Sequence, residues 1–382
     1  MGVVRRTRIL IVDDSAVMRS LLRSAVIADP ALEVAGTAAD GQSALGILAS
    51  LHPDLVLLDV EMPVMDGLVT VRELRARGHR MPVIMCSSLT QRGARVTIEA
   101  LAGGASDYVA KPVAQATRED ALQALSRELL PRIHALTSPA REQPPFAAAP
   151  RLAILPTRAS PLRAAPPQAQ PISSAPAVLV IGVSTGGPAA LDVLLSALPA
   201  GFPLPVLVVQ HMPELFTRML AERLNQRCRL RVSEAAEGDR LSPGAIHIAR
   251  GNWHLEVLAP SLAGGPATLH LTQAPPENHC RPAVDVLFRS AAAAYGAGVL
   301  AVVLTGMGSD GLAGCRVIRA HGGAVLAQDR ATSTIWGMPG AVAVAGLAQQ
   351  VLPLADIAPE ILRFVARAGG ELHEPRAAVV NP

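Results

Sequence analysis

From residue 7 to about residue 135, short apolar runs alternate with amphipathic stretches. The apolar runs lie at Arg8–Val12, Glu33–Thr37, Leu55–Asp59, Pro82–Ser87 and Asp107–Ala110. The stretches between them, and one after the last, have the spacing of helices with one apolar face. Continuous apolar strands that alternate with helices are typical of a parallel sheet covered on both sides. The pattern therefore predicts a doubly wound α/β domain over residues 1–135.

A second series of apolar runs begins after residue 176. Strands are predicted at Val178–Ser184, Pro205–His211, Ala245–Ala249, Leu255–Leu258, Thr268–Thr272, Val299–Thr305 and Ala324–Gln328. Helices are predicted at Pro188–Leu198, Leu215–Gln226, Ala283–Tyr295, Leu312–His321 and Ile357–Ala368. Residues 244–272 carry three strands without a helix between them, which indicates a hairpin insertion. We expect a Rossmann-like parallel α/β domain with that insertion over residues 177–370, followed by a tail, 371–382.

The segment between the two series, residues 136–176, has a different composition. It is rich in Ala and Arg, and prolines recur throughout it at positions 139, 144, 145, 150, 156, 161, 166, 167, 171 and 176. Such a tract neither continues a helix nor packs a core. We expect a semi-extended linker between two domains.

Composition narrows the class of protein. Hydrophobic residues make up 50% of the chain and aromatic residues only 2%, so the cores must consist of Ala, Val, Leu and Ile. The net charge of +3 gives no electrostatic footprint for nucleic acid. No stretch approaches the ~20 apolar residues of a membrane span, and the apolar run after Arg5-Arg6 is too short for an export signal. We expect a cytoplasmic protein that neither binds nucleic acid nor inserts into membranes.

The four cysteines are scattered along the chain at Cys86, Cys228, Cys280 and Cys315. No pair has the spacing of a zinc site or a redox motif. We interpret them as free thiols in a reducing compartment.

Charged residues gather at predicted strand ends of the first domain. Asp13 and Asp14 follow the first strand, Asp59 ends the third, and Lys111, the one lysine among 34 basic residues, follows the fifth. Carboxyl ends of parallel strands meet at one edge of the sheet, and clustered carboxylates suit Mg²⁺. A lysine ammonium supplies a compact charge for a phosphoryl oxygen. Any one of these residues could be a helix cap or a surface charge, but the four together favour a site where Asp59 accepts a phosphoryl group.

Residues 7–130 resemble a response-regulator receiver domain of flavodoxin-like fold. The residues that carry the resemblance are Asp13-Asp14-Ser15, Asp59, Met62-Pro63, Met65-Asp66-Gly67, Ser87, Tyr108 and Lys111-Pro112. The resemblance implies Asp59 as phosphoacceptor, Asp14 as a direct Mg²⁺ ligand and Asp13 just outside the metal's ligands. It also implies a phosphate-sensing hydroxyl at Ser87 and an aromatic switch at Tyr108.

A possible nucleophile follows the first strand of the second domain. Gly182-Val183-Ser184-Thr185-Gly186 fits the G-x-S-x-G pattern, in which a serine occupies a tight strand-to-helix turn. The spacings of a dinucleotide-binding loop and of a P-loop are absent. Ser184 could instead merely cap the helix that follows it.

A base and an orienting acid are needed to activate a serine. His211 ends one predicted strand and Asp310 follows another, so both reach the same sheet edge as Ser184 if the strands are neighbours. Position alone leaves a catalytic role for His211 open, and Asp310 could simply cap a helix. The glycines around Met307 favour a loop with inward-pointing N–H groups, as an oxyanion hole requires. The chain order Ser, His, Asp differs from that of α/β-hydrolases.

Residues 178–368 resemble the catalytic domain of protein-glutamate methylesterase, the chemotaxis CheB family. The segments that carry the resemblance are Ile181–Pro188, Gln210–Pro213, Arg281–Phe288, Leu304–Gly311 and Gly337–Pro339. The resemblance implies Ser184 as nucleophile, His211 as general base, Asp310 as orienting carboxylate, the backbone N–H of Met307 as oxyanion donor and Thr185 in support of the histidine. It implies no metal in this domain. Ala283 departs from the serine usual in the family, and we expect this to alter local bonding rather than activity.

The two resemblances together imply a phosphorylation-activated serine hydrolase. Its substrates would be glutamyl γ-methyl esters on chemoreceptors, with release of methanol, and receptor glutamines, by deamidation. A chemotaxis sensor histidine kinase would be the phosphodonor. From the domain order we hypothesise that the unphosphorylated receiver covers the site near Ser184.

Two alternatives stay open at this stage. One is the same hydrolase in a non-flagellar chemosensory array, and the other is a non-catalytic response regulator that docks on receptors. A transcription factor is disfavoured, because residues 177–382 show neither a helix-turn-helix nor a basic face.

Overall fold

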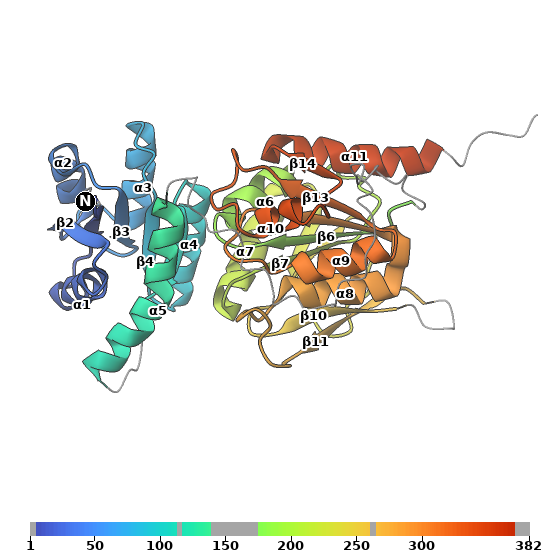
Figure 1. The fold of residues 1–382 in the computed structure, drawn as a ribbon, viewed down its shortest axis with the longest axis horizontal. Coiled ribbons are helices and arrows are strands. Elements are labelled where there is room, and N and C mark those ends of the chain that lie inside the picture. The colour runs from blue at the N-terminus through green and yellow to red at the C-terminus, as the bar shows by residue number, and fades with distance from the viewer. Residues whose placement is uncertain (1–4, 113–116, 139–174, 260–264, 371–382) are drawn as a thin grey trace, which may run out of the picture.

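The computed structural model describes residues 5–112, 117–138, 175–259 and 265–370. It contains two α/β domains (Figure 1), as the two series of apolar runs predict. Most of the predicted linker, residues 139–174, and the whole predicted tail, residues 371–382, lie outside the described residues. In the part that is described, no helix is long and apolar enough to cross a bilayer.

The N-terminal domain is a five-stranded parallel sheet in the order β2-β1-β3-β4-β5. All five predicted strands are present, each within one residue of its predicted ends. The elements are β1 Thr7–Val12, α1 Ala16–Ile27, β2 Leu32–Ala38, α2 Gly41–Leu51, β3 Leu55–Asp59, α3 Gly67–Ala76, β4 Val83–Ser87, α4 Gln91–Ala102, β5 Asp107–Ala110 and α5 Arg118–Thr137. Helix α5 extends two residues into the predicted linker.

The C-terminal domain is built on a seven-stranded parallel sheet in the order β14-β13-β12-β6-β7-β9-β8. Its first elements are β6 Val178–Val183, α6 Gly187–Ser196, β7 Val206–Gln210, α7 Glu214–Arg227, β8 Arg231–Glu234, β9 Ala245–Ile248, β10 His254–Leu258 and β11 Thr268–Thr272. The remaining elements are α8 Val284–Tyr295, the 3₁₀ turn η1 Gly296–Gly298, β12 Val299–Val303, α9 Leu312–Ala320, β13 Ala324–Gln328, α10 Met338–Val344, β14 Gln350–Leu352 and α11 Leu354–Gly370.

Three features of this domain differ from the sequence prediction. The hairpin comprises only β10 and β11, because β9 pairs in parallel with β7 and β8 inside the main sheet. Strands β8 and β14 were missed because they are short edge strands without a continuous apolar run. Helix α10 was missed because its seven residues include a proline and a glycine.

The sheet order places three strand ends together. Strand β6 lies between β12 and β7, so the chain leaves β6 in one direction and later returns to its other side. Ligands of open α/β sheets bind at the carboxyl ends of strands where the order reverses in this way. The loops after β6, β7 and β12 therefore meet at one edge, and they carry Ser184, His211 and Asp310 respectively.

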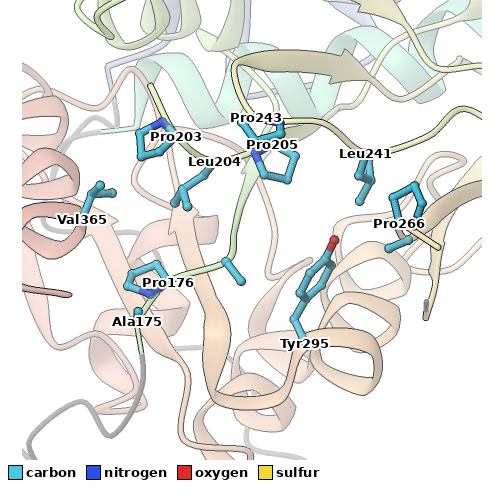
Figure 2. A pocket seen from close by; sticks show the side chains of 12 residues that line it. Ala175, Pro176, Pro203, Leu204, Pro205, Leu241, Pro243, Pro266, Tyr295 and Val365 are labelled. Atoms are coloured by element: carbon cyan, nitrogen blue, oxygen red, sulfur yellow. The ribbon is translucent and has the colours of Figure 1, made fainter. Parts of the chain in front are cut away.

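The opposite edge of the same sheet carries a cavity that is lined mainly by apolar residues. A cavity of about 570 Å³ lies at the amino ends of β6 and β7, and Figure 2 shows the side chains that line it. Its lining is dominated by Pro176, Pro203, Pro205, Pro243 and Pro266, and among the described residues the phenol of Tyr295 is its one titratable side chain. Acids, bases and nucleophiles are thus concentrated at the other edge.

The N-terminal domain packs against the carboxyl edge of the C-terminal sheet, with α4 on α6 and α7. The ring of Tyr108 on β5 stacks on Phe216 of α7, with the centroids 4.6 Å apart. At the periphery, Arg95 of α4 and Glu222 of α7 form an ion pair of 3.9 Å. The face made by α4, β5 and α5 therefore covers the edge that carries Ser184.

Candidate active site and phosphorylation site

The four charged residues predicted at the first site lie together. Carboxylate oxygens of Asp13, Asp14 and Asp59 all fall within 4.8 Å of one another. The Lys111 ammonium lies 2.8 Å from Asp13 and 2.7 Å from Asp59. Burial raises the pKa of Asp59, helped by the charge of Asp13 and opposed by Lys111. Three carboxylates against one ammonium leave an excess of negative charge in a partly buried site, which fits a divalent cation.

The two predicted switch residues occupy different places. Ser87 is buried at the end of β4, where its hydroxyl accepts a hydrogen bond from Thr97 of α4 at 2.8 Å and donates to the carbonyl of Ser88. Tyr108 lies in the interface, stacked on Phe216, and burial raises its pKa. The acidic pocket is thus connected through β4 and β5 to the face that packs on the C-terminal domain.

The turn that carries Ser184 is held by backbone hydrogen bonds and by glycines. The Ser184 N–H donates to the carbonyl of Thr305 at 3.0 Å, and the side chain of Gln210 donates to the carbonyl of Ser184 at 3.0 Å. Gly186 has a φ of +79°, and a Cβ there would collide with Thr334. Gly186, not Ser184, occupies the N-cap of α6. The capping alternative for Ser184 is therefore wrong.

His211 and Asp310 form the expected pair. His211 Nε2 lies 2.8 Å from Asp310 Oδ2. Asp310 is 3% exposed, and its carboxylate also accepts backbone N–H bonds from Val284, Asp285 and Gly311. It does not cap α9, whose N-cap is Gly311. The carboxylate instead lies at the N-terminus of α8, where the helix dipole favours a negative charge.

The same contacts bear on the expectation that Ala283 alters local bonding rather than activity. Ala283 is the N-cap of α8 and has no side chain that could cap it. The first two N–H groups of the helix, those of Val284 and Asp285, are bound by Asp310. A carboxylate from another element thus supplies hydrogen bonds that a capping serine could offer only in part.

The pKa values of His211 and Asp310 are shifted in opposite directions. Burial acts to raise the pKa of Asp310, but the hydrogen bond and charge of His211, with two backbone N–H groups, outweigh it and lower the pKa. Burial acts to lower the pKa of His211, but hydrogen bonds with Asp310 and Cys280 outweigh it and raise the pKa to about 9. With the receiver in place, the imidazolium is therefore favoured at neutral pH.

Two further predicted residues lie beside the serine. The backbone N–H of Met307 makes no hydrogen bond within the described residues, and its side chain is 41% exposed. The Thr185 hydroxyl donates to Asp107 of the receiver at 2.8 Å, whereas no hydrogen bond between Thr185 and His211 occurs in the described part of the chain. In this arrangement Thr185 contacts the other domain rather than the histidine.

Both domains line one cavity of about 650 Å³ over the site. It contains Ser184, His211 and Met307 from the C-terminal domain and Asp107 and Arg132 from the receiver. Sequence reasoning missed Asp107, Asn278 and Cys280, which also line it. Asp107 lies in a predicted strand, and the other two lie in a loop just before the Arg281–Phe288 motif, so only their place in the fold could single them out.

Comparisons with known proteins identify both domains. The family model described as CheB methylesterase matches residues 179–361, and the one described as response regulator receiver domain matches residues 9–123. A protein-glutamate methylesterase/protein-glutamine glutaminase of Nocardioides sp. is 53% identical over 360 residues, which are 94% of this chain and 96% of that protein. The chain belongs to this methylesterase family. A similarly named protein of Trichodesmium erythraeum is 45% identical over 358 residues, 94% of this chain and 99% of the relative.

Solved structures resemble the two domains separately. The Thermotoga maritima CheB methylesterase catalytic domain is 41% identical and covers 50% of this chain and 100% of its own, with a TM-score of 0.48. The response regulator domain of Thermotoga maritima CheB is 38% identical and covers 34% of this chain and 95% of its own, with a TM-score of 0.31.

Family membership confirms the enzyme class expected from the sequence. The chain is a receiver-linked methylesterase of the chemotaxis type. Its receiver domain implies Mg²⁺-dependent phosphorylation by a kinase, and its methylesterase domain implies receptor substrates.

Proposed function

We propose that Ser184 hydrolyses γ-methyl esters of glutamate on chemoreceptors, and that it deamidates receptor glutamines by the same route. One observation carries the proposal: Ser184, His211 and Asp310 come from three strand ends and line or adjoin one cavity, with a free N–H at Met307 beside them. This is the set of groups that acyl transfer to a serine needs.

We assign each residue a role in this reaction, and the hydrogen bond between His211 and Asp310 supports the assignment. Because Asp310 engages Nε2 of His211, Nδ1 is the atom that would take the Ser184 proton. Ser184 Oγ then attacks the ester carbonyl, and the Met307 N–H stabilises the oxyanion. The proton passes from His211 to the leaving group, which departs as methanol from the ester or as ammonia from glutamine. Water then attacks the acyl-enzyme with His211 again as base.

The receiver would control access to this site. In the structure it lines the cavity through Asp107 and binds Thr185, the neighbour of the nucleophile. We infer that phosphorylation of Asp59 weakens this packing. Asp14 and Asp59 would bind Mg²⁺ directly, and Asp13 would lie just outside the metal's ligands. The ion would offset the negative charge of the phosphoryl group. Lys111 would then bind a phosphoryl oxygen, and Ser87 and Tyr108 would respond to it. We also propose that the receiver domain comprises residues 1–135 and the catalytic domain residues 177–370.

The test is methanol release from methylated receptor membranes. Wild type and Ser184→Ala are compared with and without a small-molecule phosphodonor and Mg²⁺. We expect the phosphodonor to raise the wild-type rate and Ser184→Ala to lose ~10³-fold or more, because the oxyanion hole alone gives little turnover. Equal inertness of both proteins under both conditions would leave a docking role or another substrate as the better account.

A further inference from the structure

A tight turn next to the active site contacts the catalytic carboxylate. Glu277 and Cys280 exchange two backbone hydrogen bonds, of 3.0 and 2.9 Å, around Asn278 and His279. Both central residues have positive φ, of 52° and 62°, the pattern of a type I′ turn, in which asparagine is favoured. Arg289 of α8 holds Glu277 by two hydrogen bonds of 2.7 and 2.6 Å. The turn is thereby anchored to the helix whose N-terminus binds Asp310.

The side chain of Asn278 lies between two acids. Its amide nitrogen is 2.9 Å from Asp310 Oδ1 and 3.0 Å from Asp285 Oδ2. An amide NH₂ has two hydrogens, so it can donate one to each carboxylate. Asp285 otherwise accepts from the N–H of Gly314 at 2.6 Å. Asn278 is thus the group that separates two neighbouring negative charges.

We propose that Asn278 is a positioning residue for the catalytic acid: its amide holds Asp310 and Asp285 in place so that Asp310 presents Oδ2 to His211. This inference rests on the proposed role of Asp310. In the described part of the chain, every other hydrogen bond to Asp310 comes from His211 or from a backbone N–H group. Among the described residues, Asn278 is therefore the one side chain outside the triad that forms a hydrogen bond with this acid.

A purely conformational role for Asn278 makes a different prediction. Glycine and aspartate also tolerate positive φ, so a residue needed only for the turn could be replaced by either. Neither can donate to two carboxylates at neutral pH, and an aspartate would add a third negative charge. The shape of the turn and the hydrogen bonds to the acids can therefore be tested separately.

The experiment measures kcat, KM and the pH profile of methanol release for the full chain with Mg²⁺ and phosphodonor. The variants are Asn278→Gly, Asn278→Asp and, as control at a positive-φ position that does not line the cavity, His52→Asn. We expect kcat to fall roughly 10- to 100-fold in Asn278→Gly, as for loss of a hydrogen bond to a charged group, with little change in KM. Asn278→Asp should fall further. His52→Asn should stay within about twofold of wild type.

The pH dependence of kcat/KM is a readout that a loss of folded protein alone does not shift. An added carboxylate at position 278 stabilises the imidazolium of His211, so the acidic limb of kcat/KM should move to higher pH in Asn278→Asp. If both Asn278 variants keep wild-type kcat and an unmoved profile, the inference is overturned while the proposed function stands. If wild type itself releases no methanol, the proposed function fails first. Thermal unfolding of each variant identifies any loss of kcat that is only misfolding, and such a loss would also count against the inference.

Discussion

His211 shows how single contacts decide the chemistry of a residue. Its ring is held between Asp310, Cys280 and the wall of a buried cavity, and the hydrogen bonds outweigh burial in setting its pKa. A base must be neutral to accept a proton, so the imidazolium is the inactive form. The contacts that orient the ring therefore also limit the fraction of enzyme that is ready to react.

We predict a steep alkaline activation of the basal rate. Because the pKa of His211 is about 9, the neutral fraction, and with it kcat/KM, should rise roughly tenfold per pH unit between pH 7 and 8 and level off above pH 9. The same raised pKa contributes stability that is fully present below pH 6.5 and lost as pH rises through 9. Rates of methanol release across this range, without phosphodonor, check the activity.

Cys280→Ala tests the cause of the shift. Losing the hydrogen bond of Cys280 removes one group that favours the imidazolium, so the profile should move to lower pH. Cys228→Ala, a partly exposed cysteine at the end of α7, is the matched control and should leave the profile unchanged. Identical profiles for the two variants would contradict this explanation.

At the scale of elements, the contact of α4 with α7 keeps the receiver over the site. Met219 of α7 faces Ile98 and Arg95 of α4 across a small cavity, and it is 8% exposed in the packed molecule. This contact involves none of the residues that line the cavity over Ser184 and His211. It is therefore a place where packing can be weakened without touching the chemistry.

We predict that Met219→Glu raises the basal activity of the full chain. A carboxylate buried at this contact loses its hydration and lies next to the like charge of Glu222, so the receiver should dock less often. The rate of methanol release without phosphodonor should rise about 5- to 150-fold, the usual range of coupling between two sites. Arg218→Glu, at an exposed position of the same helix, is the control. A basal rate as low in Met219→Glu as in the control would show that this contact does not restrain the enzyme.

At the scale of the whole molecule, two sites in different domains share one packed structure. Asp59 ends β3 in the receiver, and Ser184 follows β6 in the catalytic domain. Between them, Ser87 contacts α4 through Thr97, and Tyr108 contacts α7 through Phe216. A change of charge at Asp59 can act on Ser184 only by changing how these elements pack.

The substitution Asp59→Asn should abolish activation by phosphodonor without changing the basal activity at Ser184. An amide cannot form the acyl phosphate, so a phosphodonor with Mg²⁺ should no longer raise methanol release. The basal rate should stay within about twofold of wild type, because Lys111 keeps its pair with Asp13. Glu61→Gln, which changes an exposed acid two residues after Asp59 that pairs with Arg92, should respond like wild type. Full activation of Asp59→Asn would place the phosphorylation site elsewhere.

The sequence by itself determined the elements and the residues at their ends. Buried strands such as β3 and β6 are continuous apolar runs because both faces of the sheet are covered, and the acids and the serine directly follow such runs. An apolar run followed by a turn is a local pattern, and neighbouring residues in the chain largely specify it. Short edge strands such as β8 lack that signal.

Only the tertiary structure decided which of these residues meet. Ser184, His211 and Asp310 are far apart in the chain and converge because β6 lies between β7 and β12. The contact of Thr185 with Asp107 depends on how two domains pack, and that of Asn278 with Asp310 on a turn anchored by α8. Such contacts depend on strand order and on complementary surfaces, and neither leaves a periodic trace in the sequence.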